Sequence, residues 1–195
     1  YCAQEYHGEL FVGGVFGMLG TGTNLVQSPG AARWNGTNWS AVGSGNQHFD
    51  LAVWNDSLVA AADGYVKVWN GSTWRKLTST SFDGFTFGLA EHAGSLYALG
   101  ESGFGATTLN GIGRWTGSTW EAVGTGFDDG NGTPQVGVSW NGDLVVGGQF
   151  AVAGGVNARN IARWDGSAYH ALAGGVNGWV EALLADGADL LVSGS

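Results

Sequence analysis

One seven-residue phrase recurs four times along this chain of 195 residues, at 33–39, 68–74, 114–120 and 163–169. Each copy holds a Trp, a turn with a central Gly and a second aromatic residue, in the same order. A phrase that returns at a period of roughly 45 residues is typical of stacked or radial arrays of small sheets. The phrase therefore predicts a repeat architecture, and it does not by itself identify a ligand.

Short β-branched and aromatic runs alternate with Asn-Gly, Asp-Gly, Asn-Asp and Gly-Gly pairs, and we find no sustained helical spacing of apolar residues. We expect the first strand of each repeat at 3–6, 49–54, 86–91, 135–140 and 179–184. Tight hairpin turns should follow at 7–8, 55–56, 93–94, 141–142 and 186–187. The second strands should lie at 10–14, 58–62, 96–100, 144–148 and 190–194. A third strand ends in the first Trp of the phrase, and a fourth begins near the second aromatic residue.

This pattern predicts an all-β fold, a β-propeller of four-stranded antiparallel blades in a single domain. The blades should span 1–45, 46–84, 85–130 and 131–175, with a partial blade at 176–195. A half blade leaves unpaired strand edges, which natural proteins avoid. Either the segment belongs to a longer propeller, the alternative we favour, or a neighbouring chain completes the blade.

The composition excludes several classes of function. The formal net charge is −9, with 7 basic against 16 acidic residues, which argues against nucleic acid and anionic membranes as partners. No apolar run is long enough for a membrane-spanning helix, so we expect no membrane insertion. The chain begins at Tyr1 without a visible signal peptide, as a mature or excised segment would. Cys2 is the single cysteine and cannot form an internal disulfide.

Small residues recur at the end of the second expected strands. Glycine pairs occupy 13–14 and 147–148, and three alanines occupy 60–62. Because alanine replaces glycine there, we interpret these positions as needing small size where blades crowd together, rather than a positive φ. The loops that follow Phe16 and Phe150 are the longest and differ most between repeats. They are either the site of binding specificity or a simple variation in length.

Residues 144–150 read Leu-x-Val-Gly-Gly-x-Phe, and 154–166 read Gly-Gly-x-x-Ala-Arg-Asn-Ile-Ala-Arg-Trp-Asp-Gly. This pattern resembles the secreted kelch-like propeller repeats of bacterial surface proteins and fungal cortical polarity-marker proteins. The resemblance covers the whole chain, most clearly in the first and fourth repeats and weakly in the second. It implies an extracellular, non-enzymatic, scaffolding or adhesive role, and it carries over no catalytic residue.

The aromatic residues of the phrase form two series. We interpret the first as structural anchors that pack between blades, and these are Trp34, Trp69, Trp115 and Trp164. The second series lies on the outermost strand and either packs in the same way or stacks on sugar rings, and it comprises Trp39, Trp74, Trp120 and Tyr169.

Asn-x-Ser/Thr sequons are a second candidate site, and they occur at Asn35, Asn38, Asn55, Asn70 and Asn131. Three of them are also Asn-Gly turn pairs, so either N-glycosylation or turn chemistry explains them.

No metal, cofactor or catalytic site is predicted. Residues 127–133 contain acidic and glycine residues that suggest a calcium loop, but the spacing of an EF-hand is missing, and we expect a solvated turn. The four histidines are scattered over different strand positions, and no nucleophile motif is present.

The sequence therefore favours an extracellular structural or adhesive interaction scaffold, such as a subunit of a surface layer or fibre. The expected partners are other protein chains, in a homo-oligomer or fibre, and glycans. A lectin-like carbohydrate-binding propeller is the alternative, and an enzyme with a site at the propeller axis is the less favoured third.

Overall fold

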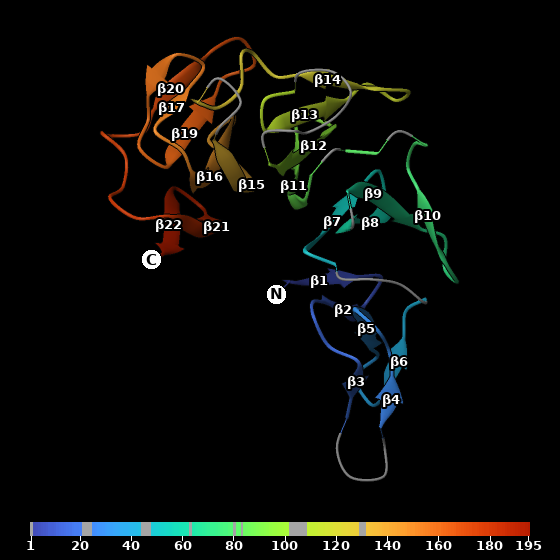
Figure 1. The fold of residues 1–195 in the computed structure, drawn as a ribbon. Coiled ribbons are helices and arrows are strands. Elements are labelled where there is room, and N and C mark those ends of the chain that lie inside the picture. The colour runs from blue at the N-terminus through green and yellow to red at the C-terminus, as the bar shows by residue number, and fades with distance from the viewer. Residues whose placement is uncertain are drawn as a thin grey trace.

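The computed structural model describes residues 2–20, 25–43, 48–62, 64–79, 81–82, 84–101, 109–128 and 132–195. Four antiparallel four-stranded sheets follow one another along the chain, and a two-stranded hairpin comes last. The sheets stand side by side around an open arc, each with one edge toward the inside (Figure 1). The predicted all-β propeller architecture is confirmed, and the described residues contain no helix that could cross a membrane.

We number the four sheets as blades 1 to 4 in chain order. Blade 1 consists of β1 (Cys2–Tyr6), β2 (Glu9–Gly13), β5 (Ala31–Trp34) and β6 (Trp39–Ala41). Blade 2 consists of β7 (Asp50–Trp54), β8 (Ser57–Ala62), β9 (Tyr65–Trp69) and β10 (Trp74–Lys76). Blade 3 consists of β11 (Thr86–His92), β12 (Ser95–Gly100), β13 (Ile112–Trp115) and β14 (Trp120–Ala122). Blade 4 consists of β15 (Thr133–Trp140), β16 (Asp143–Gln149), β19 (Ile161–Trp164) and β20 (Tyr169–Ala171). The last hairpin pairs β21 (Val180–Asp186) with β22 (Asp189–Gly194).

The hydrophobic core is divided among the interfaces between neighbouring blades. The first strands β1, β7, β11, β15 and β21 contact one another in succession along the inside of the arc. Leucines at the start of the second strands pack toward the preceding blade, and Leu58, Leu96 and Leu144 are fully buried. The equivalent Leu10 of blade 1, which packs against no preceding sheet among the described residues, is 40% exposed. Burial therefore depends on the neighbouring blade more than on the residue type.

The predicted hairpin turns between first and second strands carry the expected left-handed backbone. Asn141 and Gly142 have φ of 49° and 87°, and His7–Gly8, Asn55–Asp56 and Ala93–Gly94 behave in the same way. Positive φ at both central residues is the signature of a type I′ turn. The last turn departs from the prediction of 186–187, because Asp186 pairs with Asp189 and the turn falls at 187–188. Gly187 takes the first central position with φ of 58°, where glycine is unstrained.

The long loops of blades 1 and 4 contain small ribbons that the sequence pattern did not predict. In blade 1, β3 (Met18–Leu19) pairs with β4 (Val26–Gln27), and in blade 4, β17 (Val152–Ala153) pairs with β18 (Val156–Asn157). Two paired residues a side are too short to show a period of two in the sequence.

Close neighbouring atoms require a small residue at the positions of the glycine pairs, as predicted. A Cβ on Gly13 would lie 2.6 Å from the Cys2 Sγ, and one on Gly147 would lie 2.4 Å from a methyl of Val180. Neither glycine has a positive φ. Close approach of adjacent strands and blades therefore determines these positions.

Candidate functional site

The turn inside each repeated phrase is closed by the side chain of its first residue. The Oδ1 atom of Asn70 accepts hydrogen bonds from the backbone N–H of Ser72 and Thr73, at 3.0 and 2.8 Å. Asn35, Asp165 and the Thr116 hydroxyl accept the corresponding bonds in the other three blades. These contacts lower the pKa of Asp165 well below its usual range, chiefly through the backbone N–H of Ala168 and the Ser167 side chain. The phrase is thus a recurring side-chain-closed turn.

The structure places the first aromatic series in the walls of the blade interfaces. Trp69, Trp115 and Trp164 are buried, and Trp34 is half-buried. Each ring lies against the second aromatic residue of its own phrase, with centroids 4.8 to 5.4 Å apart.

In blades 2, 3 and 4 the second aromatic series contacts the preceding blade. The indole N–H of Trp74 donates to the Val42 carbonyl of blade 1 at 3.2 Å, and the Tyr169 hydroxyl donates to the Val123 carbonyl of blade 3 at 3.0 Å. Trp120 packs edge-on against Phe82, and its indole nitrogen is buried without a described hydrogen-bond partner. Trp120 and Tyr169 are buried, so their faces are not available to a sugar in this structure.

Trp39 is the member of this series that keeps an open neighbourhood. It belongs to blade 1, and no sheet of the described residues precedes this blade. With Trp34, Leu25 and Asn38 it lines a cavity of about 480 Å³. The two indole rings are tilted at 50° with centroids 5.4 Å apart. On blade 1, these two tryptophans of the repeated phrase therefore border accessible space.

A further series of contacts between blades was missed at the sequence level. The last residues of β1, β7 and β11 reach the hairpin turn or strand of the next blade. The Tyr6 hydroxyl donates to the Asp56 carbonyl, the Trp54 indole donates to the Gly94 carbonyl, and His92 Nδ1 lies 2.9 Å from the Ser139 hydroxyl. A large side chain recurring directly before each hairpin turn is the sequence signal that could have identified them.

Four of the five sequons lie on described, exposed residues. Asn35 and Asn70 use their side-chain oxygens to close turns, Asn55 occupies a left-handed hairpin position, and Asn38 is exposed beside the Trp39 cavity. Asn131 lies outside the described residues. Turn closure gives two of these asparagines a role that needs no glycan, and all four remain accessible.

The loop of blade 4 borders a cavity of about 610 Å³ in volume. Asp128, which the sequence placed in a candidate calcium loop, accepts backbone hydrogen bonds from Ala151 and Val152 there. The side chain of Asn160 is also engaged in hydrogen bonds, since it accepts one from the Phe150 N–H and donates one to the Val176 carbonyl. The remaining residues of that candidate loop, 129–131, lie outside the described part of the chain.

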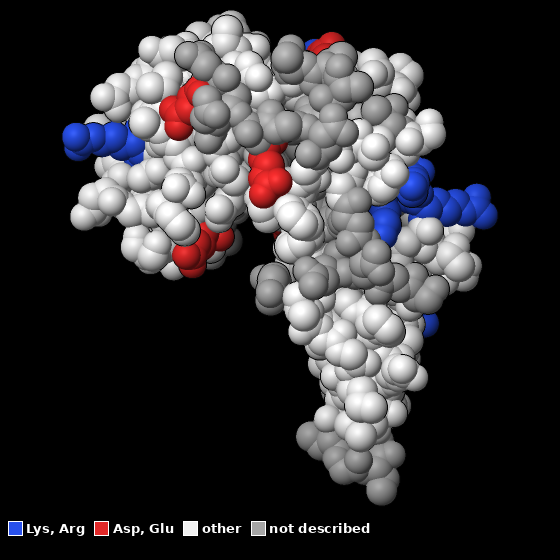
Figure 2. All heavy atoms as spheres, viewed as in Figure 1, with Lys and Arg blue, Asp and Glu red and all other residues white. Residues whose placement is uncertain are grey.

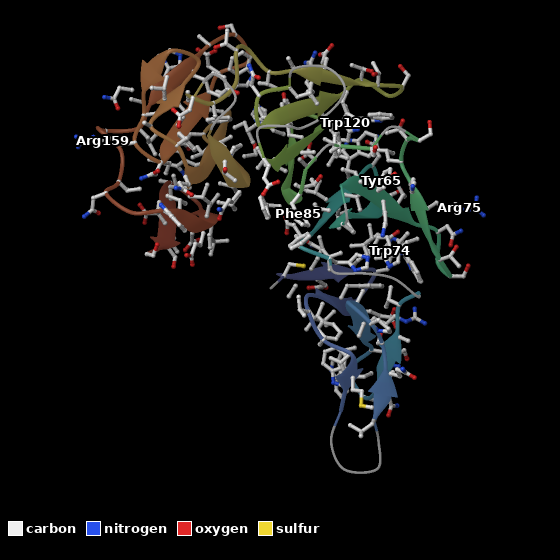
Figure 3. All side chains as sticks on the ribbon, in the orientation of Figure 1. Tyr65, Trp74, Arg75, Phe85, Trp120 and Arg159 are labelled. Atoms are coloured by element: carbon white, nitrogen blue, oxygen red, sulfur yellow. The ribbon has the colours of Figure 1, made fainter. Side chains whose placement is uncertain are left out.

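A partly exposed aromatic cluster lies at the inner border of blades 2 and 3. It consists of Phe49, which precedes β7, and of Phe85 and Phe87 at the start of β11. The three ring centroids are 5.6 to 6.0 Å apart. Figure 3 places Phe85 on the inner side of the arc, whereas Arg75 and Arg159 project from its outer sides. We call Phe49, Phe85 and Phe87 the inner aromatic cluster.

The exposure of Phe85 differs from that of the other apolar side chains. Most exposed large apolar residues lie in blade 1 or in the last hairpin, which have a neighbouring sheet on one side only among the described residues. Phe85 is 49% exposed although blades 2 and 3 are covered on both sides.

A partly buried acidic residue, Asp50, lies next to this region. Asp50 accepts the backbone N–H of Leu89 from blade 3 and that of its neighbour Leu51, both at 2.8 Å. Burial raises the pKa of its carboxyl to about 6 even though both hydrogen bonds act in the opposite direction. Burial, together with the charge of Asp50, raises the pKa of the Cys2 thiol to about 12, so Cys2 is a protonated thiol at neutral pH.

The histidines do not converge. His7 and His170 lie beside Asp56 and Asp165 in exposed turns, while His48 packs on Trp74 at a ring distance of 5.0 Å. Within the described ranges no group of three or more His, Cys, Asp or Glu side chains is arranged to hold a metal ion.

Comparison with known proteins supports the fold. No family model and no curated protein matches the chain. Among solved structures it is similar to the computationally designed Ika8 protein, with 15% identity over 99% of this chain and 54% of the other and a TM-score of 0.61. It also resembles the extracellular domain of the putative hybrid two component system BT4673 from B. thetaiotaomicron (13% identity, 98% and 24% coverage, TM-score 0.64). A third match is YCF48 bound to D1 peptide (14% identity, 99% and 60% coverage, TM-score 0.57).

The chain therefore spans less than two thirds of each of these structures. At such low identity they show the propeller-like fold.

Proposed function

We propose that this chain is a protein-interaction segment of an extracellular β-propeller. The observation that carries the proposal is the half-exposed ring of Phe85, at the inner border of blades 2 and 3, where no other described large apolar side chain is exposed. A rigid sheet scaffold that presents an aromatic anchor is typical of interaction surfaces. Charged residues are scarce, at 12% of the chain, which suits association with other chains.

Two further findings support this proposal. One similar structure is an extracellular domain, and another was solved bound to a peptide. The kelch-like character of residues 144–166 agrees with a scaffolding or adhesive role at the cell surface, without catalysis. Assembly into a surface layer or fibre, and glycosylation of the exposed sequons, are the more specific parts of the proposal.

A displayed library of random twelve-residue peptides tests the interaction function, with the folded chain as bait and an unfolded sample as control. We expect enrichment of peptides with a shared pattern on the folded chain alone. If no peptide is enriched over the unfolded control, the interaction function is wrong.

The second candidate function is carbohydrate binding by blade 1. The Trp34–Trp39 pair beside its cavity offers an aromatic face and the polar groups of Thr37 and Asn38, which are the elements of a sugar subsite. A glycan array probed with the wild type and with Trp39→Ala distinguishes this function. Binding that Trp39→Ala removes would support it, and an empty array at high protein concentration would count against it.

A further inference from the structure

The inner aromatic cluster has an acidic neighbour. The backbone N–H of Phe85 donates to Glu101 Oε2 at 3.3 Å, and the Glu101 N–H donates to the Phe85 carbonyl at 3.1 Å. These two contacts hold the carboxylate beside the exposed ring. Among the described residues Glu101 has no ion-pair partner, and its second carboxylate oxygen accepts no described hydrogen bond.

No Lys or Arg side chain forms an ion pair with Glu101 among the described residues. The arginines of the repeated phrase pair with acidic residues of their own blades, as Arg33 with Glu9 at 3.0 Å and Arg163 with Asp143 at 2.6 Å. On the face drawn in Figure 2, Lys and Arg project at the outer sides of the molecule, whereas acidic side chains lie both on the upper part and toward the inner border. The inner border therefore combines an apolar anchor with unbalanced negative charge.

The rings of the cluster are also held in place. Phe49 meets both other rings edge-on, at interplanar angles of 71° and 77°. A ring supported in this way loses little conformational freedom when it is covered, which favours its use as a binding anchor.

We propose that the Phe85–Glu101 site binds a cationic apolar peptide segment, in which an arginine lies next to a large apolar residue. The guanidinium group can lie over the Phe85 ring while it donates to the free oxygen of Glu101. The adjacent apolar side chain covers the remaining face of the cluster. This inference rests on the proposed interaction function and specifies the chemistry of its partner.

The test uses the 195-residue chain and a fluorescein-labelled probe of sequence Gly-Arg-Phe-Arg-Leu-Gly, measured by fluorescence anisotropy. Two matched peptides replace the arginines by glutamates, or the Phe and Leu by serines. We expect the probe to bind, and both matched peptides to bind at least about tenfold more weakly. Equal binding of the glutamate peptide would overturn the assignment of a cationic partner.

Variants of the chain locate the site. Phe85→Ala should weaken binding of the probe about tenfold or more, and Glu101→Gln should weaken it and reduce its dependence on salt. Met18→Ala removes a somewhat more exposed apolar side chain from blade 1 and should leave binding unchanged. Circular dichroism and the melting temperature confirm that each variant is folded. If Phe85→Ala binds as the wild type does, the site is wrong.

The two proposals can fail separately. If the displayed library yields peptides whose binding is insensitive to Phe85→Ala, the chain is an interaction module that uses another surface. If the library yields none and the probe does not bind, both proposals are wrong.

Discussion

At the scale of single residues, size and environment decide what each position tolerates. The second-strand glycines contact a neighbouring strand or blade, whereas the glycines of the repeated phrase provide a positive φ in open space. The same residue type thus serves two physical needs, and only the surroundings show which applies.

Gly147→Ala should destabilise the protein by about 1–3 kcal/mol, because the new methyl would overlap the stiff side chain of Val180. Gly17→Ala is the matched control, since a Cβ there meets nothing within 4 Å and φ is not positive. Urea unfolding followed by tryptophan fluorescence measures both. Equal midpoints for the two variants would contradict the close-packing argument.

Asp50 should make stability depend on pH. Its folded pKa of about 6 lies above the ordinary value of 3.8, so the folded state binds more protons between these values. The free energy of unfolding contributed by Asp50 is therefore highest below pH 4 and falls as the pH rises to 6, by about 2–3 kcal/mol. Asp50→Asn cannot titrate.

Comparison of unfolding free energies at pH 4 and pH 7 tests this expectation. The pH dependence should be smaller in Asp50→Asn than in the wild type, and the exposed control Asp189→Asn should behave as the wild type does. An unchanged dependence in Asp50→Asn would show that another group is responsible.

At the scale of elements, hydrogen bonds and rings fasten one blade to the next. Trp74 and Tyr169 each reach the carbonyl at the end of the preceding blade's fourth strand, and Tyr6 and Trp54 reach the turn of the following blade. A four-stranded sheet of this size cannot bury its faces alone, so these contacts set the relative position of the blades.

Tyr169→Phe should lower the free energy of unfolding by about 1 kcal/mol or slightly more, because the buried Val123 carbonyl loses its partner. Tyr6→Phe removes the same kind of bond from an exposed carbonyl, which water can solvate, and should cost less. Chemical denaturation of the two variants supplies the comparison. A larger loss for Tyr6→Phe would contradict the role of burial.

At the scale of the whole molecule, some strand edges and apolar faces of the arc are covered by a neighbouring strand or blade and others are exposed. In the described structure β16 pairs on both edges, with β15 and β19, whereas β22 pairs with β21 alone. The last hairpin also exposes Leu184 and Leu191, whose equivalents Ala90 and Tyr97 are buried in blade 3.

Hydrogen exchange measured by mass spectrometry should reflect this asymmetry. Amides of residues 189–194 should exchange at least about tenfold faster than those of 143–149, because an edge strand opens without disturbing a second neighbour. Peptides from β8 and β12 serve as internal controls and should resemble β16. Equal protection of β22 and β16 would show that the open edge is covered in solution.

The sequence by itself determined the repeat, the strand order and most turns, because these depend on local features: turn residues, alternation and the period of the phrase. It also determined that the second-strand glycines are small for reasons of space. The sequence did not predict the short loop ribbons or the position of the last turn, because neither produces a distinct local pattern.

Only the tertiary structure decided which recurring residues are open. Trp39 and Tyr169 occupy equivalent places in their phrases, yet Trp39 borders a cavity and Tyr169 is buried, because Tyr169 packs against the preceding blade of the described structure. Phe85 carries no distinguishing motif, and its exposure beside Glu101 arises where two blades meet. Accessibility is a property of neighbours distant in sequence, and a repeated local pattern does not contain it.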